Sequence, residues 1–372
     1  MSLMKEGWTY KRFDAVFDLQ MGKTPDRKNP QYFEGPNVWV SIRDLTTKEI
    51  CDSNEHISDT AVDVTNIHKV KKGTVIMSFK LTVGKCAIAA RDLYTNEAIM
   101  AFNLRGGYDI SSDFLFYYLS NYKWEGANKA VMGITLNKAT ISRHKIGYPS
   151  SSKQKIIVSE LDKINELISL KKSQLKGLDI LAQSIFYEMF GDPVTNEKGW
   201  GVKPLGKVVK DVFAGGDKPN DFSETKTNEY CYPIIANGDG DTGILGYSKI
   251  FRVSEEAITI GARGASIGNC RICREKFLPV VRLITIIIGK SITAEYLFYY
   301  VKQHKFNIVG AGQAQLTVPN VISAPIPLPP LSLQHQFAER VEAIERLKQQ
   351  VQTSIKDLEI LLASRMDYWF ND

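Results

Sequence analysis

Two cysteines three residues apart, Cys270 and Cys273, are the most recognisable candidates for metal chemistry in this sequence. A structural zinc site needs four ligands, commonly two such pairs or one pair with suitably spaced histidines. No second pair follows, and the related Cys86 has no cysteine three residues on. The cysteines are five and unpatterned, which indicates reduced thiols. The pattern therefore favours buried thiols on a strand and predicts no metal site.

Signatures of catalysis on DNA or nucleotides are missing as well. An amino-directed DNA methyltransferase would carry Asn/Asp-Pro-Pro-Tyr/Phe, and the nearest approach, at residues 29–32, lacks the second proline. Residues 261–268 are rich in glycine but have neither the phosphate-loop nor the dinucleotide spacing, so a tight strand turn is favoured. The histidines are scattered: His56, His68, His144, His304 and His335. We therefore predict a chain without a catalytic site or a cofactor of its own.

Positive charge is concentrated in two blocks of the sequence. Lys and Arg exceed Asp and Glu by four (20 against 16) in residues 1–150 and by four (16 against 12) in residues 193–331. Residues 151–192 are neutral (6 against 6), and residues 332–372 are acidic (5 against 7). Two basic modules with non-basic spacers suggest a polyanion that is contacted at two places.

The chain repeats itself. Matched landmarks recur in the same order, including Gly-Trp at 7–8 and 199–200 and the aromatic runs at 114–119 and 296–301. Both halves then pass through a proline-containing segment, at 146–149 and 326–329, and end on aromatic residues. One structural unit is therefore used twice.

Each repeat begins with short apolar runs separated by Gly, Pro, Asn and Asp, which predict strands. The runs are 38–42 and 74–78 in the first repeat and 257–260 and 283–288 in the second. One short helix is expected at 112–122 and again at 293–304. These patterns predict two globular domains of the α+β class.

Each repeat ends in a long helix with a heptad stripe. Residues 153–190 contain no proline, and apolar residues recur there with 4-3 spacing. The second stripe lies 180 residues further on, since Phe337 corresponds to Ile157. A sustained period of 3.5 residues predicts a coiled-coil seam, and about 35 residues would span on the order of 50 Å. The predicted seam comprises Ile157, Leu161, Ile164, Ile168, Leu175, Leu178, Ile185, Phe337, Val341, Ile344, Val351, Ile355, Leu358 and Leu362.

The order domain, helix, domain, helix predicts a pseudo-two-fold arrangement with the two helices antiparallel. The expected segments are a first domain (1–151), a central helix (152–192), a second domain (193–331) and a C-terminal helix (332–372). The alternative is that each long helix packs on its own domain or mediates homodimerisation. A rod that carries two similar basic domains suits DNA read at two half-sites, with major grooves about 34 Å apart. Because the domains differ outside the landmarks, the half-sites should differ too.

No apolar run approaches the roughly 18 residues that span a bilayer, and the first residues lack the layout of a signal peptide. We therefore expect a cytoplasmic protein without membrane contact. Specific DNA contacts require Arg, Lys, Asn or Gln at groove edges, whereas cations on phosphates only position the protein. The candidates are Lys23, Arg27, Lys28, Lys80, Lys85, Lys218, Arg263, Gln313 and Gln315, and the alternative for each is a solvated surface residue.

Several of these segments resemble one known family. Residues 310–316, the proline-rich run 325–331 and the heptad helix that follows are similar to the end of a target-recognition domain in Type I restriction–modification specificity subunits. The opening Gly-Trp and residues 263–268 also look like that family. The first-repeat counterparts are looser: 133–137 lacks the glutamines, and 80–84 lacks the first glycine of 263–268.

The resemblance implies a non-catalytic subunit. Each domain would bind half of a split, asymmetric double-stranded DNA site, and the helices would set the spacing and dock two methyltransferase (modification) subunits. Those partners would bring S-adenosylmethionine, and restriction subunits would bring ATP- and Mg-dependent translocation and cleavage. Two alternatives stay open: a coiled-coil scaffold without DNA specificity, and a DNA-modifying enzyme with an unrecognised site.

Overall fold

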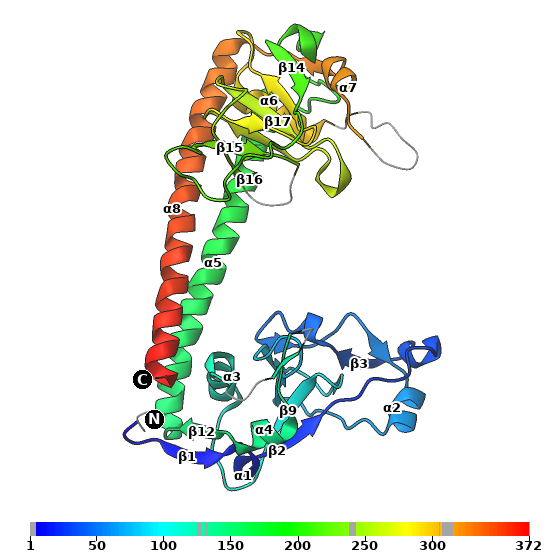
Figure 1. Cartoon of the computed structure of the whole chain (residues 1–372), viewed down its shortest axis with the longest axis vertical. Helices are drawn as coiled ribbons and strands as arrows, with labels where there is room; N and C mark the ends of the chain where they lie inside the picture. Colours follow the sequence, from blue (N-terminus) through cyan, green and yellow to red (C-terminus); the bar gives the residue numbers. More distant parts are fainter. Residues whose placement is uncertain are drawn as a thin grey trace. The chain divides into compact units, whose positions relative to one another are not determined.

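The computed structural model describes residues 5–124, 128–130, 133–237, 243–304, 306 and 315–371. The chain forms two compact units: unit 1 comprises residues 1–170 and 354–372, and unit 2 comprises residues 171–353. Each unit thus contains one α+β domain and a segment of both long helices, α5 (Ser151–Phe190) and α8 (Leu331–Phe370) (Figure 1). The compact units therefore cut across both helices, unlike the four consecutive segments expected from the sequence.

Unit 1 is built on a five-stranded sheet. The strands of unit 1 are β1 (Thr9–Arg12), β2 (Phe17–Met21), β3 (Asn37–Val40), β4 (Glu49–Ile50), β5 (His56–Ile57), β6 (Val75–Ser78), β7 (Cys86–Ala89), β8 (Tyr94–Thr95), β9 (Ile99–Leu104), β10 (Asn128–Ala130), β11 (Gly133–Thr135) and β12 (Lys145–Tyr148). The main sheet has the order β2-β9-β6-β7-β4, antiparallel except that β4 joins β7 in parallel. A smaller sheet has the order β5-β3-β8, and β1 pairs with β12 and β10 with β11. The helices are α1 (Phe13–Val16), α2 (Asp59–Thr65), α3 (Ser112–Asn121) and α4 (Lys138–Arg143).

Unit 2 repeats this plan. Its strands are β13 (Val202–Pro204), β14 (Asp211–Ala214), β15 (Tyr232–Ile235), β16 (Ile244–Ser248), β17 (Ala257–Ile260), β18 (Cys270–Cys273), β19 (Leu278–Pro279), β20 (Ile284–Ile287) and β21 (Pro325–Pro327), and its helices are α6 (Ala294–Gln303) and α7 (Val318–Ile322). The main sheet, β14-β20-β17-β18, has the same antiparallel order as β2-β9-β6-β7. The small sheet β16-β15-β19 and the pair β13-β21 complete the correspondence. The α+β class and the internal duplication predicted from the sequence are confirmed.

Both faces of each main sheet are covered, which explains why the central strands are largely apolar on both faces. In β6, Val75 and Met77 point to a core cluster shared with α3, whereas Ile76 points to a second cluster that includes Val38 and Val40 of β3. In β17, Ile258 likewise faces the cluster that contains α6. Helices α3 and α6 start within one residue of their predicted positions because Ser111 and Thr293 cap them through hydroxyl groups that accept from the third backbone N–H.

The two long helices run antiparallel in each unit. In unit 1, Glu160 of α5 accepts hydrogen bonds from Arg365 and, at 2.9 Å, from the Trp369 indole of α8, while the Lys153 ammonium lies 4.7 Å from the Trp369 ring. In unit 2, the Phe186 and Phe337 rings are 5.6 Å apart and Lys348 pairs with Asp179 at 2.8 Å. Residue numbers on α8 therefore fall as those on α5 rise, as the duplication predicted.

Most predicted seam residues are buried in the structure. Fully or largely buried are Ile157, Leu161, Ile164, Ile168, Phe337, Val341, Ile344, Val351 and Ile355, whereas Leu175, Leu178, Ile185, Leu358 and Leu362 are half-buried. Near the end of α5, Phe186 rather than Ile185 is completely buried, because it packs on Tyr296 and Tyr299 of α6 as well as on α8. The polar seam residue Lys348 is satisfied by Asp179 and Glu345.

The ends of the chain meet in unit 1. The Lys5 ammonium donates a hydrogen bond to the backbone oxygen of Tyr368 near the end of α8, and Asn121 of α3 donates to the Met366 oxygen at 3.1 Å. In unit 2, Lys198 donates to the Glu188 oxygen at 2.5 Å near the end of α5. A lysine shortly before each Gly-Trp pair thus donates to a backbone oxygen near the end of a long helix. Among the described residues, no helix has the length and apolar character needed to cross a membrane.

A buried glutamine ties the start of each long helix to its domain. The Gln334 side-chain oxygen accepts from the Thr293 backbone N–H at 3.0 Å, and its amide donates to the Pro329 and Ser291 oxygens at 2.9 and 3.3 Å. Gln154, 180 residues earlier, accepts from the Ser111 N–H at 2.9 Å and donates to the Pro149 and Asp109 oxygens at 3.0 and 2.8 Å. Both glutamines are essentially inaccessible to solvent. One amide thus orients the long helix against the N-terminus of the short helix.

Replacing either glutamine by leucine should destabilise the unit that contains it. Gln334→Leu keeps most of the volume but leaves the Thr293 N–H and the Pro329 carbonyl buried without partners, and unsatisfied buried groups cost about 1–3 kcal/mol each. We expect a loss of at least about 2 kcal/mol in the free energy of unfolding, measured by urea titration. Gln183→Leu, an exposed position on α5, is the control and should change stability by less than about 0.5 kcal/mol. Equal effects of the two substitutions would contradict this role.

Candidate nucleic-acid interface

Three of the seven predicted basic candidates fall on one equivalent pair of loops. Loop 1 (residues 79–85) connects β6 to β7, and loop 2 (residues 261–269) connects β17 to β18. Loop 1 carries Lys80 and Lys85, and loop 2 carries Arg263. In each domain, the structure therefore places these candidates at the same end of the main sheet.

Backbone hydrogen bonds hold the two loops in the same way. The Leu136 N–H donates to the Phe79 oxygen at 2.8 Å, and the Leu316 N–H donates to the Ala262 oxygen at 3.0 Å. Near the loop ends, Gly84 donates to the Ser78 oxygen at 3.0 Å and Gly268 to the Gly261 oxygen at 3.0 Å. Two loops of different length, seven and nine residues, thus share these backbone hydrogen bonds and present different side chains.

In loop 2, an arginine and a glutamine act as a pair. The exposed Arg263 guanidinium donates to the Gln315 side-chain oxygen at 2.9 Å, and the two backbones form an antiparallel bridge. A guanidinium has five N–H donors, and this bond uses one of them. Arginine donates to guanine and glutamine pairs with adenine in the major groove, so both groups suit base recognition. Gln313 and most of the segment 310–316 lie outside the described residues.

Loop 1 presents lysines instead. Lys85 is exposed, and Lys80 is half-buried with its ammonium 5.5 Å from the Phe79 ring. Between them, Leu81 is exposed and has a positive φ of 65°, which a leucine seldom adopts. Base-contact chemistry alone would not have identified Leu81. The signal in the sequence was that Leu81 aligns with Gly264 of the second repeat. In the structure, the φ of Gly264 is 66°.

Two of the remaining candidates of the first domain, Lys23 and Arg27, have structural partners. Lys23 donates to the Thr65 and Asn66 oxygens at 2.8 and 3.0 Å and so satisfies carbonyls at the end of α2. Arg27 forms a bidentate pair with Glu55 at 2.6 and 3.0 Å, and this hydrogen bonding lowers the pKa of the Glu55 carboxyl. These bonds bring segment 23–28 against the small sheet, in a setting different from that of loop 1.

Aromatic rings also surround some of these cations. The Arg27 guanidinium carbon lies 4.8 Å from the Phe33 ring and 5.3 Å from the Trp39 ring. In unit 2, the exposed Lys218 ammonium lies 3.5 Å from the Phe222 ring. Lys28 is exposed. Lys28 and Lys218 are therefore open to a phosphate, whereas Arg27 would have to share its guanidinium with Glu55.

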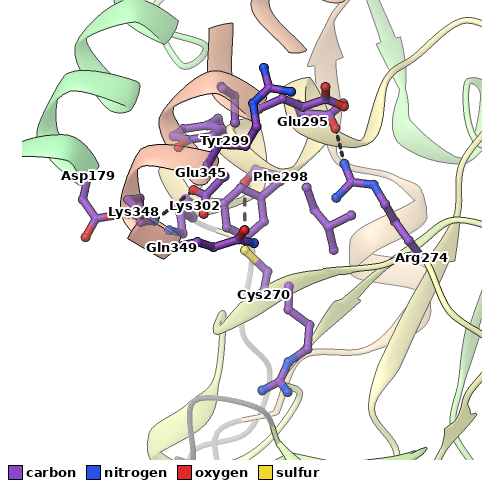
Figure 2. A pocket seen from close by; sticks show the side chains of 15 residues that line it. Asp179, Cys270, Arg274, Glu295, Phe298, Tyr299, Lys302, Glu345, Lys348 and Gln349 are labelled. Atoms are coloured by element: carbon purple, nitrogen blue, oxygen red, sulfur yellow. Dashed lines mark hydrogen bonds and ion pairs between the residues drawn. The ribbon is translucent and has the colours of Figure 1, made fainter. Parts of the chain in front are cut away.

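A cavity of about 500 Å³ in unit 2 is lined by charged side chains from α5, α6, α8 and β18 (Figure 2). Arg274 pairs with Glu256 at 2.9 Å and with the buried Glu295, and Lys348 pairs with Asp179 and Glu345. Because these charges compensate one another, the cavity is better explained as an ion-pair network that ties the helices to the sheet than as a ligand site.

Cys270 and Cys273 lie on β18 with an odd spacing, so their side chains point to opposite faces of the sheet. Cys270 contacts the Phe298 oxygen at 3.9 Å in the cavity of Figure 2, and Cys273 contacts the Thr259 hydroxyl at 4.0 Å. Burial raises the pKa of Cys270 to about 11 and also raises that of Cys273, which disfavours the thiolates that metals require. Within the described ranges, no three His, Cys, Asp or Glu side chains are grouped to hold a metal ion.

Both domains share one plan. Each packs on an antiparallel helix pair and presents a polar loop at the same end of its main sheet. These features define a duplicated two-domain recognition protein. The model of the Type I restriction modification DNA specificity domain matches residues 5–178 and again residues 197–357. The chain therefore belongs to this family and contains its domain twice.

Individual relatives agree with this assignment. A Mycoplasma pneumoniae protein that carries the name of a type I specificity subunit is 30% identical over 241 residues, or 63% of this chain and 65% of the relative. The specificity subunit of the type I restriction enzyme MjaIX from Methanocaldococcus jannaschii is 23% identical over 91% of this chain and 86% of its own length. The chain thus spans just under two thirds of the first relative and most of the second.

A solved structure shares the fold. A chain from a study of complex assembly and conformational transition in a type I restriction–modification system superposes with a TM-score of 0.62. The match covers 98% of this chain and 97% of the other, at 17% identity. The chain therefore shares its fold with this solved structure over nearly its whole length.

We propose that Arg263, supported by Gln315, reads a base, and a substitution series tests this. Arg263→Ala should relax selection at one base pair of the half-site read by the second domain, by about 1–3 kcal/mol. Lys85→Ala removes an exposed cation from loop 1. It should weaken binding to all DNA sequences equally and reduce the slope of log affinity against log salt concentration by about one. Binding of base-substituted duplexes over a salt series measures both effects. Lys207→Ala, an exposed cation elsewhere in unit 2, is the control. Loss of affinity without loss of discrimination in Arg263→Ala would show a phosphate contact instead.

Proposed function

We propose that this chain is the DNA-recognition subunit of a Type I restriction–modification complex and that its two domains read the two halves of a split, asymmetric site. The observation that carries this proposal is the pair of equivalent loops with different side chains. Lys80 and Leu81 in loop 1 stand where Arg263 and Gly264 stand in loop 2. Because the two loops share these backbone hydrogen bonds, both domains would dock on the duplex in a similar way. Their different side chains would then select different bases.

The proposal assigns the spacing of the half-sites to the long helices. Helices α5 and α8 have 40 residues each, and at 1.5 Å per residue each is about 60 Å long. Each contributes to both units, and a buried glutamine fixes how each begins. A helix pair is stiff compared with a loop, so the number of unread base pairs between half-sites would be fixed.

Repeated apolar side chains on the helices support docking of two identical partners, which we propose to be the methyltransferase subunits. In unit 1, Leu167, Ile360 and Leu361 are 47%, 60% and 45% exposed. In unit 2, Leu347, Ile180 and Leu181 are 49%, 63% and 46% exposed. Each residue of one set lies 180 positions from its counterpart in the other. Duplication has thus preserved two equal exposed apolar sets, which we call patch 1 and patch 2.

The leucines of each patch border the helix seam. Leu167 and Leu361 directly precede the seam residues Ile168 and Leu362, and Leu347 and Leu181 directly precede Lys348 and Ala182. In an antiparallel pair, positions that precede the seam on both helices lie along the same edge. A helical segment of the partner placed on that edge would cover both leucines and extend the packing of the pair.

In this scheme the chemistry belongs to the partners. S-adenosylmethionine would be bound by the modification subunits, and ATP and Mg by restriction subunits, while this chain, in the cytoplasm, contributes DNA recognition. A scaffold without DNA specificity would share the helix pair and the patches, but it would give no reason for different side chains on two equal loops.

Methylation mapping tests the central claim. The chain is purified with its neighbouring modification subunit, the complex is incubated with DNA and S-adenosylmethionine, and methylated adenines are mapped. We expect a split asymmetric motif that depends on this chain. A complex that methylates without sequence preference would favour the scaffold. Modification of DNA by the isolated chain would favour the enzyme alternative.

Charge substitutions in one patch should change the stoichiometry of the complex. The double variant Leu167→Glu/Leu361→Glu removes two leucines from patch 1, each of which contributes about 1.5–3 kcal/mol when buried. We expect this variant to hold one modification subunit in place of two, measured by native mass spectrometry. Ile156→Glu is the matched control, because Ile156 is 57% exposed on α5 but its counterpart at 336 is glutamine. Retention of two subunits by the double variant would rule out patch 1 as a docking site.

A further inference from the structure

Leu81 is a strained, exposed apolar residue on loop 1. Its φ is 65°, in the left-handed region where a Cβ crowds the backbone and glycine is favoured, and its side chain is 55% exposed. The equivalent position of loop 2 is Gly264, with φ 66° and open space around the position of a Cβ. A positive φ of the same size thus falls on the expected residue in one domain and on an unfavourable one in the other.

The conformation of Leu81 is imposed by its neighbours. The Thr82 N–H donates to the Lys80 oxygen at 2.7 Å, closing the turn around Leu81. The hydroxyl of the fully buried Ser78 accepts from the Lys85 N–H at 3.1 Å and donates to the Thr82 oxygen. The Leu136 N–H anchors the start of the loop through the Phe79 oxygen. A rigid frame therefore holds the leucine side chain toward solvent.

A scattered exposed leucine is ordinary on a protein surface and needs no function. Leu81 differs in three respects. It carries backbone strain that glycine would remove, it lies between Lys80 and Lys85 in the sequence, and it neighbours the position that Arg263 holds in the other domain. Strain at an exposed position is retained where the side chain is used.

We infer that Leu81 is a specificity-determining residue of the first domain and contacts the C5-methyl group of a thymine in its half-site. The thymine methyl is the apolar group that the major groove offers, and apolar side chains recognise it there. Lys80 and Lys85 supply the charge for the flanking phosphates. This inference rests on the proposed function, and it predicts an A·T pair in the half-site of the first domain at a position that relaxes when Leu81 is removed.

Uracil substitution tests the contact, because deoxyuridine lacks only the methyl group of thymidine. Duplexes with single thymine-to-uracil replacements throughout the recognition site are bound by the complete complex of this chain with its modification subunits. For the natural chain, we expect one replacement in the first half-site to weaken binding about fourfold, the effect of one buried methyl group. With Leu81→Gly, the same replacement should have no effect, while replacements in the second half-site should act as before.

Two further variants separate the contact from changes in folding or total apolar surface. Leu81→Gly should not lower the urea midpoint, because glycine adopts this φ without strain. Leu81→Asn also tolerates the turn but offers a polar group, so it too should lose the discrimination between thymine and uracil. Val64→Ala, which shortens an exposed apolar side chain on α2 of the same unit, should keep the discrimination between thymine and uracil.

The outcomes distinguish this inference from the function on which it rests. If the natural complex binds no split motif, the proposed function fails. If it binds one but Leu81→Gly still distinguishes thymine from uracil, only the inference about Leu81 fails. Equal weakening of all duplexes by Leu81→Gly would show a non-specific contact, and loss of a modification subunit would show a protein contact. Either result would overturn the assignment.

Discussion

Everything that this chain does with its two domains depends on how firmly each domain holds its long helix. One buried amide per unit provides that hold, through Gln154 and Gln334, each with three hydrogen bonds to backbone groups on two sides. Such a bond set is directional, whereas apolar packing alone would tolerate rotation of a helix about its axis. The glutamines thus fix which face of each helix meets its partner helix and which face stays exposed.

Duplication imposes a second constraint, because two copies of one domain would read the same bases unless their contact residues diverged. The two contact loops have diverged in side chains and in length, whereas key backbone hydrogen bonds are kept. The hydrogen bonds of Leu136 to Phe79 and of Leu316 to Ala262 are the same, and so are those of Gly84 and Gly268. By contrast, the exposed apolar sets on α5 and α8 did not diverge. Under the proposed function, surfaces that would meet two copies of one partner stay alike, whereas surfaces that would meet two different half-sites do not.

Periodicity made much of the fold predictable from the sequence. The heptad stripes gave both long helices, the duplication gave their antiparallel pairing, and the predicted bounds of α3 and α6 are right to within one residue. Gln154 and Gln334 were missed, because a glutamine at the start of a helix looks like a surface residue until its backbone partners, up to 45 residues away, are known. Phe186 was missed because α5 packs on α6 at its end, which changes the buried face. Among the candidate contacts, the pairing of Arg27 with Glu55 and of Lys23 with α2 depends on tertiary structure that local patterns do not carry.

The closure of unit 1 by the last helical turns has a consequence for biosynthesis. Unit 2 ends at residue 353, but unit 1 needs residues 354–372, where Arg365, Met366 and Tyr368 contact residues that were synthesised 205 to 363 positions earlier. Contacts of such long sequence separation form late. Synthesis runs from the N-terminus, so the domain that is made first is completed last, once residues 354–372, which follow unit 2, are available. A nascent chain that stops short of its final helical turns would carry a finished second domain and an exposed apolar core in the first.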